Sequence, residues 1–222
     1  MTPEFSFCIT TKNDAKVLRR SLDSFLPQVP EGSEVVVIDG GSTDGSYQIL
    51  QEYAAAGKLT LYQERCKMSR GWQLAFEKST GRLAVFQIDT DNVLLPKLRE
   101  YLELYKAKYE GKILVTRPVP VMVAPRWAVQ KIGGWKDLWA AEDYDFYQRA
   151  RAAGLLVELK DYPMVDHYVR RPYPRGWKGL VRRWRLFWAY EQKSIPVVLS
   201  WKSWPLWTLV HLTFKVSRAK KI

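Results

Sequence analysis

The sequence predicts an α/β fold, in which a mostly parallel central sheet is flanked by helices, followed by a separate helical appendage. Two observations support this fold class. Over residues 5–160, short apolar runs typical of buried strands alternate with stretches in which apolar residues recur at helical spacing. Positive charge and tryptophan are then concentrated at the C-terminal end. We therefore expect an α/β domain over residues 1–167 and a basic, tryptophan-rich tail over residues 168–222.

The elements of the α/β domain follow one another at short intervals. The expected strands, each a short apolar run, cover residues 5–10, 34–38, 59–62 and 83–88. The expected helices cover residues 15–25, 43–53 and 69–78. Ser69 is placed as the N-cap of the third helix, and Gly81 marks the turn before the fourth strand. Strands separated by helices of this length form parallel sheets, whose ligands bind at the carboxyl ends of the strands.

The fourth strand ends at two alternate carboxylates, Asp89 and Asp91, with Thr90 between them. In a strand, residues two apart point to the same face, so both carboxylates would reach one hard cation that also binds a diphosphate. The alternative is that one of them caps the helix expected shortly after Leu95.

Polar residues follow three of the predicted strands at their carboxyl ends: Thr11-Lys12-Asn13, Asp39-Gly40-Gly41-Ser42 and Asp89-Thr90-Asp91. Asp39 would accept hydrogen bonds from a base or ribose, or serve as a turn aspartate. Asp44 is expected to be a structural N-cap. Arg70 and Lys67 would meet phosphate on the same edge, or lie on solvated surface.

The composition is that of a globular protein, since 47% of the 222 residues are hydrophobic and 26% are charged. Cys8 and Cys66 lie far apart and in no metal-ligand spacing, so we expect reduced, inert thiols and a cytosolic setting. The first strand begins near Phe5, which leaves no room for a signal peptide.

The motifs together resemble the family 2 glycosyltransferases, which have the GT-A fold. The resemblance lies in residues 9–13, 22–28, 36–45, 89–91, 133–135 and 142–143. Two positions depart from the family pattern. Thr10 stands where a proline is usual, and Gly40 stands where a second acidic residue is common, which affects the contacts to the nucleotide base.

The resemblance implies a nucleotide-sugar donor, a divalent metal and an acceptor side. The implied donor contacts are Thr11, Asn13, Asp39, Arg70, Asp89, Thr90 and Asp91. The implied ligands of Mn²⁺, or Mg²⁺, are Asp89, Asp91 and His167, the last of which is equally consistent with a plain hydrogen-bonded histidine.

On the acceptor side, the resemblance makes Asp143 the catalytic base, Glu142 its neighbour and Trp135 an acceptor contact. A carboxylate near the incoming hydroxyl would take its proton. The acidic residues at this helix start also suit the helix dipole, and an acceptor that is itself a phosphate needs no base.

The tail differs from the domain in charge. Residues 1–167 hold 22 basic and 22 acidic residues, so the net charge of +12 lies in residues 168–222, with six of the ten tryptophans. Arg183 and Trp184 partly resemble a QxxRW motif, without its glutamine, which implies contacts to the diphosphate and the acceptor sugar. The alternative is an amphipathic helix whose arginines face lipid headgroups.

Residues 195–216 are apolar but include Pro196, Lys202 and Pro205, which disfavours a spanning helix. Tryptophan interleaved with basic residues indicates a segment in the membrane interface, attracted to anionic lipid. We expect attachment to the cell membrane with the catalytic domain on the cytoplasmic face.

The sequence thus predicts a metal-dependent, inverting hexosyltransferase. Mannose from GDP-mannose is favoured by analogy, UDP-glucose is the other donor considered, and the acceptor is a polyprenyl (dolichyl) phosphate or a lipid-linked sugar. A nucleotidyltransferase and a non-enzymatic nucleic-acid-binding protein are the alternatives. A nucleotidyltransferase would have a glycine-rich basic loop after the first strand, which this sequence lacks. The zero net charge of residues 1–167 argues against a nucleic-acid-binding protein, so no nucleic-acid partner is expected.

Overall fold

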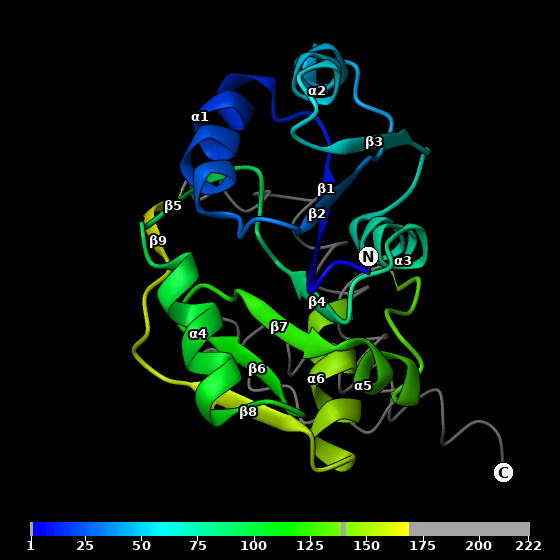
Figure 1. Cartoon of the computed structure of the whole chain (residues 1–222). Coiled ribbons are helices and arrows are strands. Elements are labelled where there is room, and N and C mark those ends of the chain that lie inside the picture. Colours follow the sequence, from blue (N-terminus) through cyan, green and yellow to red (C-terminus); the bar gives the residue numbers. More distant parts are fainter. Residues whose placement is uncertain (1, 139–140, 169–222) are drawn as a thin grey trace, which may run out of the picture. The chain divides into compact units, whose positions relative to one another are not determined.

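The computed structural model describes residues 2–138 and 141–168 (Figure 1). Its strands are β1 (Phe5–Thr11), β2 (Glu34–Asp39), β3 (Thr60–Gln63), β4 (Leu83–Phe86), β5 (Asn92–Leu94), β6 (Ile113–Thr116), β7 (Met122–Pro125), β8 (Leu156–Leu159) and β9 (Val165–Tyr168). Its helices are α1 (Ala15–Phe25), α2 (Ser46–Ala55), α3 (Met68–Lys78), α4 (Leu98–Lys108), α5 (Arg126–Lys131) and α6 (Glu142–Ala152), with a 3-10 turn, η1 (Leu26–Gln28).

The central sheet has the strand order β3-β2-β1-β4-β7-β6-β8. Strands β1 to β4 run parallel, β7 is antiparallel to both β4 and β6, and β8 is parallel to β6. The carboxyl ends of β1, β2, β3 and β4 therefore meet at one edge. The order reverses between β1 and β4, which is the place where open α/β sheets bind their ligands. The expected α/β class with a mostly parallel sheet is confirmed.

Each face of the sheet buries its own hydrophobic core, because successive side chains of a strand point to opposite faces. In β1, Phe5, Phe7 and Ile9 pack with residues of α1, α2 and α4 on one face. Cys8, between them, faces the second core with residues of α3, α5 and α6. The helices thus form a layer on either side of the sheet (Figure 1).

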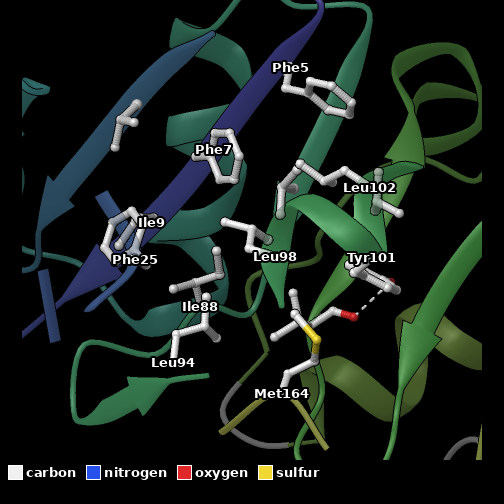
Figure 2. Packing of buried hydrophobic residues seen from close by; sticks show 14 of the residues in the cluster. Phe5, Phe7, Ile9, Phe25, Ile88, Leu94, Leu98, Tyr101, Leu102 and Met164 are labelled. Atoms are coloured by element: carbon white, nitrogen blue, oxygen red, sulfur yellow. Dashed lines mark hydrogen bonds between the residues drawn. The ribbon is translucent and has the colours of Figure 1, made fainter. Parts of the chain in front are cut away.

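The first core continues to the sheet edge where β4 ends. Ile88 and Leu94, on either side of Asp89-Thr90-Asp91, are 4% and 6% exposed and belong to this core. Figure 2 shows both among the side chains of the cluster, together with Leu98 of α4. Burial of these two apolar side chains stabilises the polar segment between them by roughly 1.5–3 kcal/mol each.

Two local expectations need correction. Strand β4 ends at Phe86 and does not extend through Ile88. Helix α3 begins at Met68, so Ser69 lies inside it, where its hydroxyl donates to the carbonyl of Leu138 at 3.5 Å instead of capping the helix. His167 lies within β9.

The predictions for the tail, including the roles of Arg183 and Trp184, concern residues outside the described ranges. Within the ranges that the structure describes, no helix has the length and apolar character needed to span a membrane.

Candidate active site

Asp89, Thr90 and Asp91 form a turn and do not continue a strand. The chain leaves β4 at Gln87, whose φ of 63° lies in the left-handed region that few non-glycine residues adopt. The amide of Asn92 then donates to the carbonyl of Asp89 at 3.1 Å, which closes the turn. The prediction that strand alternation aligns the two carboxylates is therefore wrong in its premise. Helix α4 begins only at Leu98, beyond β5, so this turn is also not its cap.

A buried polar cluster fixes this turn to the end of β1. The hydroxyls of Thr11 and Thr90 donate to the same oxygen, Oδ2 of Asp14, at 3.0 and 2.8 Å, and lie 2.9 Å from each other. Thr11 and Thr90 are 3% and 2% exposed, and Asp14 is 8% exposed. The sequence resemblance implies that both threonines contact the nucleotide-sugar donor, but in the structure their hydroxyls face this cluster. Their role in the structure is to position the turn.

Asn13 joins the loop after β1 to the loop after β2. It has a φ of 57°, a conformation that asparagine tolerates better than most residues. Its backbone amide donates to Ser42 Oγ at 2.9 Å, and its Oδ1 accepts from the amide of Thr43 at 2.8 Å. Asp44 continues the connection by accepting from the amide of Ala15 at 3.0 Å. The carboxyl edge is thus a set of loops connected by hydrogen bonds.

Asp39 is fully buried and forms the turn that follows β2. Its Oδ2 accepts from the amides of Gly41 and Ser42 at 3.2 and 3.0 Å and from Gln63 Nε2 at 2.9 Å. Its Oδ1 accepts from the Ser42 hydroxyl. In this structure Asp39 therefore serves as a turn aspartate. Its contact to a base or ribose stays a prediction.

Gly40 leaves room that a neighbouring loop fills. A Cβ at this position would lie 3.2 Å from the carbonyl of Cys66 and 3.4 Å from Cδ of Lys12. Any side chain at this position would therefore crowd the carbonyl of Cys66, whereas its contact with Lys12 would be close to an ordinary van der Waals distance.

The two cysteines are protonated near neutral pH. Burial and a nearby acid raise the pKa of the Cys66 thiol, and Cys8 is buried with a pKa raised to about 12.

Arg70 lies in the first turn of α3, the helix that follows β3 in the sequence. Its guanidinium forms a half-exposed ion pair with Glu77 at 3.3 Å. Lys67 pairs with Asp137 at 3.2 Å, also at the surface. Exposed pairs of this kind contribute little to stability, so an incoming phosphate can compete for either cation.

Glu142 and Asp143 open helix α6, and Tyr147 of this helix contacts Gln87, two residues before the Asp89–Asp91 turn. Asp143 is exposed, and its Oδ1 accepts from the amide of Tyr144 at 2.8 Å. One turn further, the hydroxyl of Tyr147 donates to Gln87 Oε1 at 2.5 Å. The structure therefore brings the two acidic motifs to the same edge of the sheet.

Trp135 is a core residue, which corrects its assignment to the acceptor. It is 3% exposed, and its ring stacks on Phe146 at 4.3 Å and lies 4.6 and 5.6 Å from the rings of Trp72 and Phe86. Its backbone amide donates to Gln73 Oε1 at 2.8 Å. The Gly133-Gly134-Trp135 segment thus secures α6 against α3 and leaves the acceptor side to other residues.

Two carboxylates on one turn suit a divalent cation that is shared with a substrate. Mg²⁺ is usually bound through one or two carboxylates plus phosphate oxygens, not by a cage of protein ligands alone. Within residues 2–138 and 141–168, the structure places no group of three His, Cys, Asp or Glu side chains that could hold a metal ion. The backbone of His167 pairs with Val93, just after Asp91, whereas its side chain is outside the description.

Sequence reasoning missed Asp14, Gln87 and Tyr147 as parts of this site. Asp14 directly follows the Thr11-Lys12-Asn13 motif, so the sequence could have indicated that it lies at this edge of the sheet. Gln87 and Tyr147 are 60 residues apart and their bond had no local signal.

Comparison with known proteins identifies relatives of one class. The family model described as Glycosyl transferase family 2 matches residues 6–177. An uncharacterized glycosyltransferase of Nostoc sp. is 31% identical over 107 residues, which cover 46% of this chain and 33% of the relative. The chain therefore spans about a third of the length of that relative.

Two solved structures share the fold. TarS of S. aureus in complex with UDP-GlcNAc has a TM-score of 0.63 at 19% identity, over 78% of this chain and 60% of its own. A mannosyltransferase of Pyrobaculum calidifontis in complex with GDP-Man and Mn²⁺ has a TM-score of 0.63 at 19% identity, over 78% and 59%. At such identities the likeness shows the fold alone, a GT-A-like α/β fold.

Proposed function

Since the chain belongs to the family 2 glycosyltransferases, we propose that it transfers a hexose from a nucleotide-sugar donor to a lipid-linked acceptor at a membrane, in a metal-dependent, inverting reaction. One observation carries this proposal. The Asp89-Thr90-Asp91 turn and helix α6, which begins with Glu142 and Asp143, are linked at the carboxyl edge of the sheet by the bond from Tyr147 to Gln87, two residues before Asp89. Donor and acceptor chemistry would therefore occur side by side.

The donor side is built for a diphosphate. Asp89 and Asp91 would bind a divalent cation, with His167 as a further ligand, and the donor's phosphate oxygens would complete its coordination. When bound, the cation would neutralise the charge that develops on the leaving diphosphate. Thr11, Thr90 and Asp14 keep the carboxylates in place, and Arg70 would exchange its surface partner Glu77 for phosphate.

On the acceptor side, Asp143 is the proposed base and Glu142 its neighbour. Asp143 is exposed at the start of a helix, so an incoming hydroxyl can reach it. A phosphate acceptor already carries an anionic oxygen, and Asp143 would then orient the acceptor without removing a proton. Arg183 and Trp184 remain proposed contacts of the diphosphate and of the acceptor.

GDP-mannose is the favoured donor, and UDP-glucose is the other. The mannosyltransferase with GDP-Man supports the first, and the TarS complex supports a uridine nucleotide. The acceptor is proposed to be a polyprenyl-type phosphate or a lipid-linked sugar. The basic, tryptophan-rich tail supports attachment to anionic lipid, with the catalytic domain on the cytoplasmic face of the cell membrane.

A panel of nucleotide sugars tests the proposal. Thermal stability of the full chain is measured with each donor, with and without Mn²⁺. The expected result is stabilisation by one nucleotide class only in the presence of metal, followed by transfer of labelled sugar to dolichyl phosphate in detergent. If no nucleotide sugar stabilises the chain and none is consumed with metal present, the proposal is wrong.

A further inference from the structure

The segment that leads from β4 into the Asp89–Asp91 turn is connected to helix α6 by a buried hydrogen bond. Tyr147 is 6% exposed and Gln87 is 3% exposed, and the hydroxyl of Tyr147 lies 2.5 Å from Gln87 Oε1. This is the short end of the range for O–H···O hydrogen bonds. A buried bond of this kind fixes the distance between two elements that come from distant parts of the chain.

The tyrosine ring is itself fixed from two sides. The guanidinium of Arg117, at the carboxyl end of β6, lies 4.8 Å from the ring centroid and is held there by Glu158, at 2.6 Å. The ring of Phe146 meets it edge-on at 6.4 Å. Burial raises the pKa of Tyr147, partly opposed by Arg117, so the hydroxyl remains a donor at neutral pH. Tyr147 therefore presents a fixed donor to Gln87.

The residue that receives this bond is the one at which the chain leaves β4, two residues before the turn. Gln87 has a φ of 63°, a conformation that costs of order 1–3 kcal/mol for a non-glycine residue and persists only where its surroundings impose it. The bond from Tyr147 is such a constraint. Two residues further along the chain is Asp89, and one helical turn before Tyr147 is Asp143.

We propose that Tyr147 is a positioning residue for sugar transfer, which acts through Gln87 to set the Asp89–Asp91 turn at a fixed place relative to Glu142 and Asp143. The inference rests on the proposed function. Thr90 and Asp14 hold the turn independently, so the loss of the Tyr147 hydroxyl leaves donor binding in place. What changes is the alignment of the donor with the attacking group, on which rate depends steeply.

A double-mutant cycle on the full chain tests this inference. Tyr147→Phe, Gln87→Leu and the double variant are assayed for transfer from GDP-mannose, or from UDP-glucose if the wild type uses that donor, to dolichyl phosphate in detergent. We expect each single variant to lower kcat by about tenfold to a hundredfold while metal-dependent stabilisation by the donor persists. If the two residues act through their shared bond, Tyr147→Phe should change kcat less than about twofold once Gln87 is already leucine, because coupled residues have non-additive effects.

Tyr105→Phe is the matched control. Its hydroxyl donates to the carbonyl of Lys112 at 3.1 Å, away from the site, so the same atom is removed and kcat should be unchanged. Wild-type kcat in Tyr147→Phe, or equal losses in both Gln87 backgrounds, would overturn the proposal. Failure of both single variants to fold would also overturn it, since the bond would then be purely structural. A wild type without transfer would instead refute the proposed function.

Discussion

The buried cluster of Thr11, Thr90 and Asp14 gives the most direct prediction, through Thr90→Val. Valine has nearly the shape of threonine, so the change removes a hydroxyl without leaving a cavity. The lost bond is 2.8 Å long, ends on a carboxylate and lies at a residue 2% exposed to solvent. Hydrogen bonds to charged groups contribute about 1.5–3 kcal/mol, and burial keeps water from replacing the lost donor.

The expected loss follows from these values. The free energy of unfolding should fall by about 1.5–3 kcal/mol, because Asp14 keeps the bond from Thr11 but loses the shorter one. For a chain of this size, that corresponds to a Tm lower by roughly 3–12 °C. Because Thr90 lies between the two carboxylates, metal-dependent stabilisation by the donor should also weaken.

Thermal and urea unfolding measure the loss, and Thr60→Val is the matched control. Thr60 lies exposed on the edge strand β3, and its hydroxyl makes no hydrogen bond within the described residues. The control should change stability by less than about 0.5 kcal/mol. A loss of that small size in Thr90→Val would refute the view that this cluster positions the turn.

Asp91→Asn should abolish metal-dependent stabilisation by the donor, whereas Asp143→Asn should preserve it and stop transfer; normal transfer by Asp143→Asn would favour a phosphate acceptor. Gly71→Ala should destabilise the fold by about 1–2 kcal/mol in urea unfolding, because its Cβ would lie 2.8 Å from Cβ of Thr10, and this crowding outweighs the gain of about 1 kcal/mol in helix propensity. Burial acts to raise the pKa of Glu34, but bonds from a serine, a threonine and backbone amides outweigh it and lower the pKa. Its stabilisation is therefore present above the ordinary carboxyl pKa and lost as pH falls through the lowered one, so Glu34→Gln should flatten acid unfolding below about pH 4.5; an unchanged acid limb would contradict this.

Local patterns predicted the frame of this protein well. Helix α1 has the predicted bounds, and the first two strands differ from prediction by one residue at their ends. These elements are buried on one or both faces, so apolar periodicity reports them directly. The grouping of polar residues at one sheet edge followed from parallel topology alone.

The roles of single side chains were harder to predict, because they depend on contacts between distant residues. Asp39 reads as a free carboxylate at a strand end, yet Gln63 and its own turn enclose it. Trp135 reads as an exposed aromatic beside two glycines, yet it stacks on Phe146. The left-handed conformation of Gln87 has no signal in the identity of the residue, since glutamine rarely adopts it.

The two halves of the site are stabilised in different ways, and this difference assigns different tasks to them. The Asp89–Asp91 turn is fixed by the buried cluster around Asp14 and by the apolar side chains of Ile88 and Leu94 on either side of it. The positions of Asp89 and Asp91 are therefore set before any ligand binds. Asp143 is exposed on the first turn of α6, where the helix dipole favours its charge and its Oδ1 accepts from the adjacent amide of Tyr144. Such a side is free to adjust to an acceptor. Rapid transfer still requires both halves in register, and the bond from Tyr147 to Gln87 supplies that register without rigidifying Asp143.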